Sequence, residues 1–318
     1  MLTTLGIIAL PSLGYDPFAS WQYDASVDPF MWLRDSLPGL VPGAQVSLYG
    51  YDAHPHSNCE PISIQDIAIS LISGLRGIGR SALSAKPVVF PAHSLGGVVL
   101  KQCLIELANA GQTQLFMLRT VKACIFLAVP NCLPPPSELS MIANCGRLRG
   151  LLEDLQAARN VGYLSSMSGM LGGIAQANGI RLFSGFETVC ILRPAVFTSM
   201  ADERRQRRTE LQAGKGKSVL LLQEHESIQP GSESSDVFPI PRSHQRAAGF
   251  QPNDPTIGTI AAYTKDSIEA THSIVAEPPN PMETRSWKDL GSRLGGFMSY
   301  FSCELFQFQS PHLQAPRC

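Results

Sequence analysis

The sequence predicts an α/β protein in which a mostly parallel sheet carries helices on both faces. Short, continuous apolar runs recur along the chain, as expected of strands that are buried on both faces of a parallel sheet. Segments with helical spacing of apolar residues separate these runs, and parallel strands need such crossover connections. With 318 residues, of which 44% are hydrophobic, the chain is large enough to enclose a sizeable core.

The first expected strand is the apolar run Leu5–Leu10, which ends at Pro11. Residues 44–49 alternate apolar and polar side chains, which is typical of a strand, and the later runs are apolar throughout. The expected strands, in chain order, are 5–10, 44–49, 87–90, 121–129, 180–186 and 218–222.

Start and stop signals indicate the helices. Ser63 and Asp66 form a sequence pattern like a capping box, and Asp254 followed by Pro255 is a typical N-cap and first helical residue. The first expected helix covers 30–37 and ends at Pro38 and Gly39, and the third covers about 95–108. The second begins after Ser63 and carries four apolar residues on one face: Ile64, Ile67, Leu71 and Leu75. The last begins after Asp254 and runs to about Tyr263.

The regular pattern loosens after Pro130. Residues from about 137 to 178 suit two helices with a Gly/Ser/Met-rich stretch, 165–173. An insertion at this place is where many lipases carry a lid or acyl-binding cap, and an ordinary helical excursion is the alternative. We expect one domain over residues 1–275, with 276–318 as a poorly ordered tail whose aromatic stretch, 297–308, has no place in the sheet.

Composition excludes several classes of function. The net charge of −1 argues against a nucleic-acid partner and against a general electrostatic attraction to membranes. The eight cysteines include no C-x-x-C pair, so we expect no metal site and no cofactor, and a reducing compartment fits best. Residues 1–10 lack the basic start and the cleavage site of a signal peptide, and no run is long enough to span a membrane, which predicts an intracellular, cytoplasmic protein.

The chemistry-bearing motif is Ala92-His-Ser-Leu-Gly96, which follows the strand at 87–90 and opens an apolar helix. It matches the G-x-S-x-G nucleophile elbow, with alanine in the first glycine position, and this strand–turn–helix context is that of an α/β-hydrolase. Ser94 is therefore the expected nucleophile. The backbone N–H of Leu95 is expected to face the developing oxyanion. His93 is expected to be structural, because the base normally comes from a distant loop.

The remaining two members of a triad should follow in the order acid, then histidine. His244 is the expected base, because it lies in a loop between the last expected strand and the final helix. Glu187 is the expected acid, at the end of the strand over 180–186, and its carboxylate would orient the imidazole. Glu224, Glu226 and Asp202 are alternatives for the acid.

Several stretches together resemble the serine esterase/lipase family typified by the serine-active-site-containing (SERAC-like) proteins, and most closely its fungal branch, which is often fused to NACHT or ankyrin domains. The stretches span about residues 5–270: Ser12–Gly14 to Trp21, Met31–Asp35, Tyr49–Asp52, Ala92–Gly97, Val129–Asn131, Phe186–Thr188 and Arg242–His244. The resemblance implies an α/β-hydrolase fold with Ser94, Glu187 and His244 as its triad. It also implies a lipid ester as substrate and association with mitochondrial or endoplasmic-reticulum membranes, which without a spanning segment would be peripheral.

One loop departs from the family pattern. The family's first loop reads His-Gly-Leu-Gly-Gly and helps to form the oxyanion hole, whereas this chain has Pro11-Ser-Leu-Gly-Tyr15. Leu13 is the expected second oxyanion donor, through its backbone N–H. Losing one such donor typically costs about a hundred- to a thousandfold in rate.

Two functions follow from these observations. The first is a serine esterase or lipase that cleaves a carboxylic ester through an acyl-enzyme on Ser94. The alternative is a catalytically weak or inactive hydrolase-fold module used for sensing or for protein interaction, which the altered loop at Pro11–Tyr15 favours.

Overall fold

The computed structural model describes residues 5–13, 16–23, 29–51, 63–77, 86–134, 151, 155, 162–192, 218–273 and 305–308. Within this part of the chain, seven strands form one sheet in the order β8-β5-β4-β3-β1-β2-β9. Six neighbouring strands run parallel, and β9 pairs antiparallel with β2 at the edge. The strands are β1 (Leu5–Ala9), β2 (Ala44–Tyr49), β3 (Val88–His93), β4 (Val121–Leu127), β5 (Arg181–Glu187), β8 (Val237–Ile240) and β9 (Leu305–Phe308).

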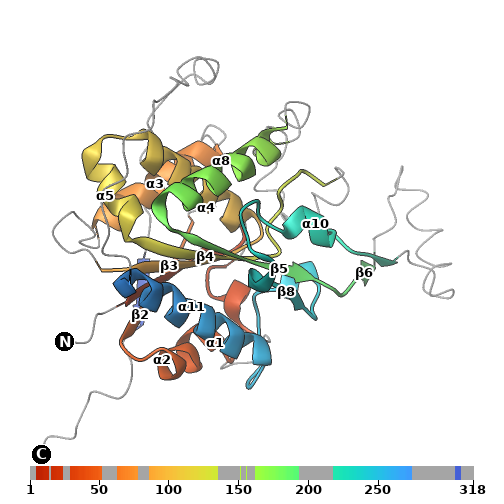
Figure 1. Ribbon diagram of the computed structural model, residues 1–318. Helices are drawn as coiled ribbons and strands as arrows, with labels where there is room; N and C mark the ends of the chain where they lie inside the picture. The colour runs from red at the N-terminus through yellow and green to blue at the C-terminus, as the bar shows by residue number, and fades with distance from the viewer. Residues whose placement is uncertain are drawn as a thin grey trace, which may run out of the picture.

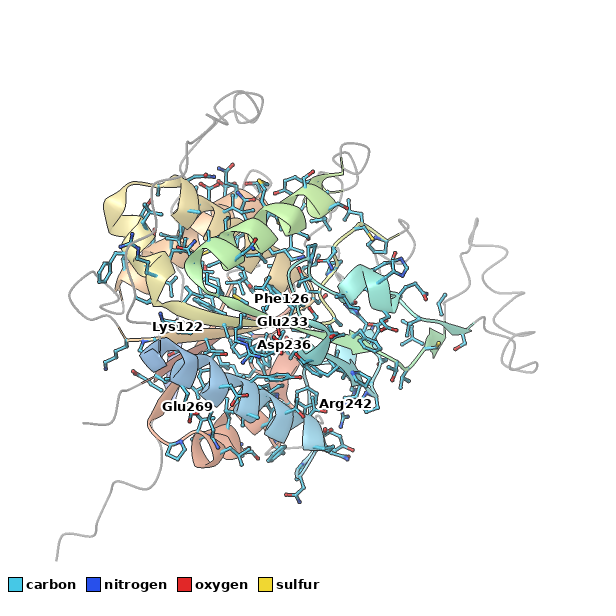
Figure 2. The ribbon with its side chains drawn as sticks, in the orientation of Figure 1. Lys122, Phe126, Glu233, Asp236, Arg242 and Glu269 are labelled. Atoms are coloured by element: carbon cyan, nitrogen blue, oxygen red, sulfur yellow. The ribbon has the colours of Figure 1, made fainter. Side chains whose placement is uncertain are left out.

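Helices cover both faces of the sheet, as the sequence predicts (Figure 1). One layer consists of α3 (Ile64–Gly77), α4 (Leu95–Asn109), α5 (Gln112–Thr120) and α8 (Tyr163–Asn178). The other contains α1 (Trp32–Asp35), α2 (Leu37–Leu40) and α11 (Pro255–Ser273). Each face has its own apolar cluster, and alternate residues of a strand enter opposite clusters. In β4, Phe126 packs under α4 and α8 (Figure 2). Its neighbour Ile125 belongs to the cluster on the other face.

The helix starts follow the local signals in the sequence. The Ser63 hydroxyl accepts a hydrogen bond from the Asp66 backbone N–H at 3.1 Å, and the Asp66 carboxylate accepts one from the Ser63 backbone N–H at 3.1 Å. This is the reciprocal pattern of a capping box. Asp254 accepts a hydrogen bond from the Thr256 N–H at 3.0 Å, so it caps α11 as predicted.

One helical prediction was wrong, and one helix was not predicted. The helix expected over 30–37 is two short helices, and Pro38 lies inside the second rather than ending the first. Proline is tolerated there because the first helical N–H groups have no partner within the helix. Helix α5 was not predicted, because its apolar pattern is weak and Gly111 before it signals a loop.

One strand prediction also needs correction, and one strand of the sheet was not predicted. The run 218–222 does not join the sheet: only β7 (Ser218–Val219) is a strand, and it pairs with β6 (Ile191–Leu192) in a separate ribbon. The last parallel strand is instead β8, in a region that looks rich in turns. Strand β8 is short and contains Pro239, and proline is accepted in a sheet mainly on edge strands such as this one.

The C-terminal residues 276–318 were expected to form a poorly ordered tail. For Leu305–Phe308 this is wrong, because these residues form β9 and pair with β2 along Val46–Tyr49. An edge strand of four residues can be added by any apolar segment that reaches the free edge, so its position along the chain does not reveal it. The rest of the tail lies outside the described residues.

Of the expected insertion at 137–178, the second helix is present as α8, and the first lies outside the described residues except for Leu151 and Leu155. Helix α8 packs in the layer with α4 (Figure 1). Met167 is part of the apolar core, whereas Met170 is 39% exposed. No helix of the described chain is both long enough and apolar enough to cross a membrane.

A fully buried lysine joins α4, α8 and the loop after β4. The Lys101 Nζ lies 3.0 Å from the Pro130 carbonyl oxygen, 2.8 Å from the Asn131 Oδ1 and 3.0 Å from the Ser168 Oγ. All three acceptors are uncharged, and burial lowers the pKa of the lysine well below its usual range. We call these four residues the Lys101 clasp.

Lys101→Met is expected to lower the free energy of unfolding by about 2–4 kcal/mol. It removes the lysine donor from the buried Pro130 carbonyl and leaves the Asn131 Oδ1 with the Ser168 hydroxyl as donor, and a buried acceptor that loses its donor costs about 1–3 kcal/mol. Urea denaturation followed by circular dichroism measures the change. Lys122→Met is the matched control: Lys122 is only partly buried and bonds the Arg119 carbonyl at an exposed site, so its loss should cost less than about 0.5 kcal/mol. Equal effects of the two substitutions would contradict a stabilising clasp.

Candidate active site

Ser94 lies at a strained turn between β3 and α4. Its backbone has φ 53° and ψ −128°, a conformation that is costly for a residue with a side chain. Both neighbouring strands hold the turn, because the His93 N–H donates to the Leu10 carbonyl beside β1 and the Ser94 N–H donates to the Leu127 carbonyl of β4. This is the geometry of a nucleophile elbow.

The first helical turn after Ser94 is packed too closely for side chains. A Cβ on Gly96 would collide with the Pro11 carbonyl, and a Cβ on Gly97 would collide with the Val129 side chain. Glycine at these positions lets the loop after β1 and the end of β4 approach the elbow. Close packing around Ser94 thus explains both Gly96 of the motif and Gly97 directly after it.

Three residues that lie far apart in the sequence meet here. The Ser94 Oγ lies 2.7 Å from the His244 Nε2, and the His244 Nδ1 lies 2.6 Å from the Glu187 Oε2. All three residues are at most 1% exposed. An ionised carboxylate only accepts, so His244 Nδ1 carries the proton and Nε2 presents its lone pair to the Ser94 hydroxyl.

Two backbone donors hold Glu187 from the other side. The N–H groups of Leu221 and Leu222 donate to the Glu187 Oε1 at 2.7 and 3.0 Å. The carboxylate therefore accepts three hydrogen bonds, which fix its orientation toward the His244 imidazole. Sequence reasoning missed both donors, because a main-chain N–H has no residue signature and these residues had been expected to continue a strand.

The loop that carries His244 follows β8 directly and is tied down at both ends. Arg242 forms an ion pair with Asp254 at 2.8 Å and lies beside the start of α11 (Figure 2). Arg246 donates to the Tyr23 carbonyl at 2.7 Å. His244 itself begins a short 3-10 helix, His244–Arg246. These contacts set the position from which the imidazole reaches Ser94.

His93 makes a contact that the sequence did not suggest. Its Nε2 lies 2.9 Å from the His244 backbone oxygen, and its ring is 2% exposed. Burial, and then the nearby His244, lower the pKa of His93 to about 3. His93 is therefore neutral at physiological pH. The imidazole in hydrogen-bond contact with the Ser94 Oγ is that of His244, not that of His93.

The oxyanion donors expected from the sequence are Leu95 and Leu13. Leu95 is the first residue of α4, and N–H groups at this position have no partner inside the helix. Leu13 is buried in the segment whose Pro11 carbonyl lies against Gly96. Gly14 and Tyr15 lie outside the described residues. The part played by either N–H stays a prediction.

Of the alternative acids, Glu224 and Glu226 lie in the described part of the chain, and neither bonds the His244 ring, whose Nδ1 contacts Glu187. Glu224 is exposed in α10 (Glu224–Ser227), and Glu226 accepts a hydrogen bond from the Gln223 N–H at 2.7 Å as part of the α10 capping box. Asp202 lies outside the described residues. His225 is also in α10 and exposed.

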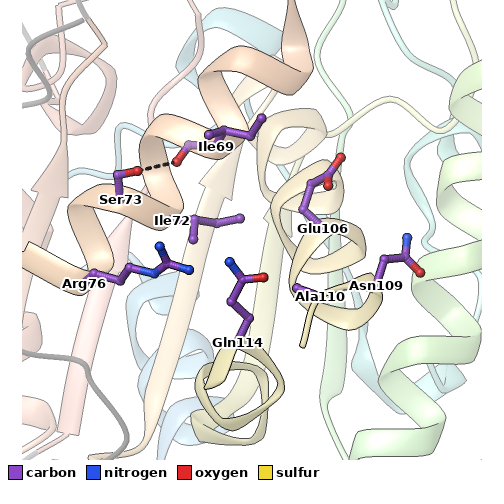
Figure 3. A pocket seen from close by; sticks show the side chains of 8 residues that line it. All are labelled: Ile69, Ile72, Ser73, Arg76, Glu106, Asn109, Ala110 and Gln114. Atoms are coloured by element: carbon purple, nitrogen blue, oxygen red, sulfur yellow. Dashed lines mark hydrogen bonds between the residues drawn. The ribbon is translucent and has the colours of Figure 1, made fainter. Parts of the chain in front are cut away.

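A separate pocket opens between α3, α4 and α5 (Figure 3). Its lining combines Ile72 with the polar side chains of Arg76, Glu106 and Gln114. It lies at the C-terminal end of α4, about 20 Å along the helix from Ser94. The pocket is therefore not part of the site around the elbow.

No protein-family model matches this sequence, and no curated protein was found as a relative. Solved structures are similar at low identity. Phospholipase PlaB from Legionella pneumophila, in complex with thio-NAD, has 15% identity and a TM-score of 0.38, covering 58% of this chain and 38% of that one. The NocB thioesterase domain, in covalent complex with a fluorophosphonate nocardicin G analogue, has 14% identity and a TM-score of 0.38, covering 84% and 95%.

The RedJ thioesterase of prodiginine biosynthesis in Streptomyces coelicolor has 12% identity and a TM-score of 0.39, covering 82% and 86%. The chain spans well under half the length of PlaB. At identities this low, the similarity bears on the fold alone and not on the activity. The parallel sheet and the elbow of this chain define an α/β-hydrolase fold, as predicted. The comparisons do not support membership of the SERAC-like family or of its fungal branch.

Acid should destabilise the folded chain through His93. Its pKa is about 3 in the folded state and 6.5 when exposed, so below pH 6.5 the unfolded chain takes up a proton that the folded chain does not. The free energy of unfolding therefore falls as the pH drops from 6.5 towards 3, with a slope from this group of at most about 1.4 kcal/mol per pH unit.

Urea denaturation of the wild type and of His93→Gln at about pH 7 and about pH 4.5 measures this term. Glutamine does not titrate, so the variant should lose less stability between the two pH values than the wild type does. Equal losses would show that His93 does not contribute.

Proposed function

We propose that this chain is a serine hydrolase that cleaves a carboxylic ester through an acyl-enzyme on Ser94. The observation that carries the proposal is the hydrogen-bonded line from the Ser94 Oγ through His244 to Glu187, with distances of 2.7 and 2.6 Å. A serine hydroxyl is a weak nucleophile until a base takes its proton, and a base is effective only when a third group orients it.

The acylation step follows from this geometry. The Ser94 Oγ attacks the ester carbonyl carbon while its proton passes to His244 Nε2, which becomes an imidazolium. The carbonyl oxygen becomes an oxyanion, which the Leu95 N–H at the positive end of α4 would stabilise, with the Leu13 N–H as second donor. The imidazolium then gives its proton to the leaving alcohol oxygen as the carbon–oxygen bond breaks.

Deacylation repeats these steps with water. His244 removes a proton from a water molecule, whose oxygen attacks the acyl carbon, and then returns the proton to Ser94 as the carboxylic acid leaves. Glu187 stays ionised throughout. The two backbone N–H donors on its Oε1 support that role, because they hold the carboxylate in place beside the imidazole that becomes charged.

We further propose a lipid ester as the substrate class and peripheral contact with membranes. Both rest on the motif resemblance to SERAC-like esterases and not on a binding site described above. Hydrolysis of ester substrates of graded acyl length distinguishes a lipase-like enzyme from a short-chain esterase. For a lipase-like enzyme, kcat/KM should rise as the acyl group of the substrate lengthens.

A fluorophosphonate probe tests the nucleophile directly, because it reacts covalently with an activated serine. The wild type is expected to be labelled and Ser94→Ala not at all, as measured by intact-protein mass spectrometry. Glu187→Gln should retain the fold but label about a thousand- to ten-thousandfold more slowly, since an amide can hold the imidazole in the wrong tautomer.

Labelling of Ser94→Ala at the wild-type rate would overturn the assignment of the nucleophile. Absence of any labelling in the folded wild type would support the other function, a hydrolase-fold module used for sensing or protein interaction. Circular dichroism of each variant confirms that the comparison is between folded proteins.

A further inference from the structure

We propose that His93 is a positioning residue that sets the distance between the nucleophile and the base by holding the main chain of His244. This inference rests on the proposed hydrolase function. It concerns a histidine that belongs to the elbow motif but not to the triad.

The carbonyl oxygen of His244 determines the chemistry of this contact. A carbonyl oxygen only accepts, so His93 must donate from Nε2 over the 2.9 Å that separates the two atoms. His93 therefore carries its single ring proton on Nε2, and its buried Nδ1 has no hydrogen-bond partner within the described part of the chain. The ring cannot take a second proton without placing an unpartnered N–H in the interior.

Two neighbouring residues, His93 and Ser94, thereby contact His244 at two points. Ser94 contacts the imidazole at 2.7 Å, and His93 contacts the backbone of the same residue at 2.9 Å. Other contacts of the loop lead to Asp254, to the Tyr23 carbonyl, to Glu187 and to the Val189 N–H, and none of these residues belongs to β3. His93 thus ties the loop with the base to the strand that carries the nucleophile.

The anchor itself is rigid. His93 ends β3 in the middle of the sheet, where it pairs with Leu127 of β4, and its N–H donates to the Leu10 carbonyl. The acceptor is also held in place, because the His244 carbonyl accepts a second hydrogen bond from the Ala247 N–H at 3.2 Å. Because both groups are held in place, the hydrogen bond between them fixes the main chain of His244 relative to β3. Misplacing reacting groups by about 1 Å can cost about a hundredfold in rate.

Two amide substitutions of His93 separate the effect of its hydrogen-bond donor from the effect of losing its ring. The amide nitrogen of His93→Gln can reach the place of Nε2, whereas that of His93→Asn reaches only the place of Nδ1. We expect the second-order rate constant for fluorophosphonate labelling to fall by about tenfold to a hundredfold in His93→Asn and by less than about threefold in His93→Gln. The final stoichiometry of labelling should reach one per chain in both.

These readouts distinguish positioning from a merely structural role. If His93→Asn only unfolds part of the protein, the final stoichiometry falls and the folded remainder labels at the wild-type rate, which overturns the proposal. Wild-type kinetics in His93→Asn overturn it as well, and so does a rate in His93→Gln as low as in His93→Asn, because the donor would then not matter.

A second measurement does not depend on catalysis. The short hydrogen bond from His244 Nδ1 to Glu187 should give a low-field proton NMR signal. We expect His93→Asn to shift or broaden that signal and His93→Gln to retain it, whereas an unchanged signal in His93→Asn overturns the positioning role. If the wild type is not labelled at all, the hydrolase proposal fails, while the NMR comparison still decides whether His93 holds His244.

Discussion

The strained turn at Ser94 is the constraint on which the rest of the site depends. A serine at φ 53° is unfavourable by itself, and it persists because β3 is hydrogen-bonded to its neighbours on both sides and α4 starts immediately afterwards. The close approach of the Pro11 carbonyl to Gly96 and of Val129 to Gly97 completes the enclosure. This packing brings three groups together above the sheet: the Ser94 hydroxyl, the first N–H of α4 and the loop after β1.

The acid side of the site depends on a longer series of contacts. Lys101 bonds Asn131, and Asn131 in turn donates from its backbone to the Glu226 carbonyl at 2.8 Å and from its side chain to the Ile228 carbonyl at 2.5 Å. Residues 226–228 end α10, whose capping residue Gln223 follows Leu222 directly. The segment that delivers two N–H groups to Glu187 is thus fastened to the same helix, α4, that begins at the nucleophile.

Much of the fold could be predicted, for physical reasons that particular elements show. β2 has the bounds Ala44–Tyr49 that its pattern predicts, and β1, β3, β4, β5 and α4 differ from expectation by one to three residues at an end. Their apolar character comes from burial on both faces, which is a property of the local sequence. β8 and β9 were not predicted because an apolar run of four residues is too short to identify a strand, and their places in the sheet depend on the free edges of β5 and β2.

Local sequence determined the elbow, the parallel core and the caps of α3 and α11, since each depends on residues within a few positions of one another. It also named Ser94, Glu187 and His244 as candidates, through chain order and through the ends of expected strands. Only the tertiary structure decided that these three meet within hydrogen-bond distance, that Leu221 and Leu222 turn their N–H groups to Glu187, and that His93 reaches the His244 carbonyl. The reason is physical: main-chain donors and acceptors are the same in every residue, so their partners are decided by how the chain packs.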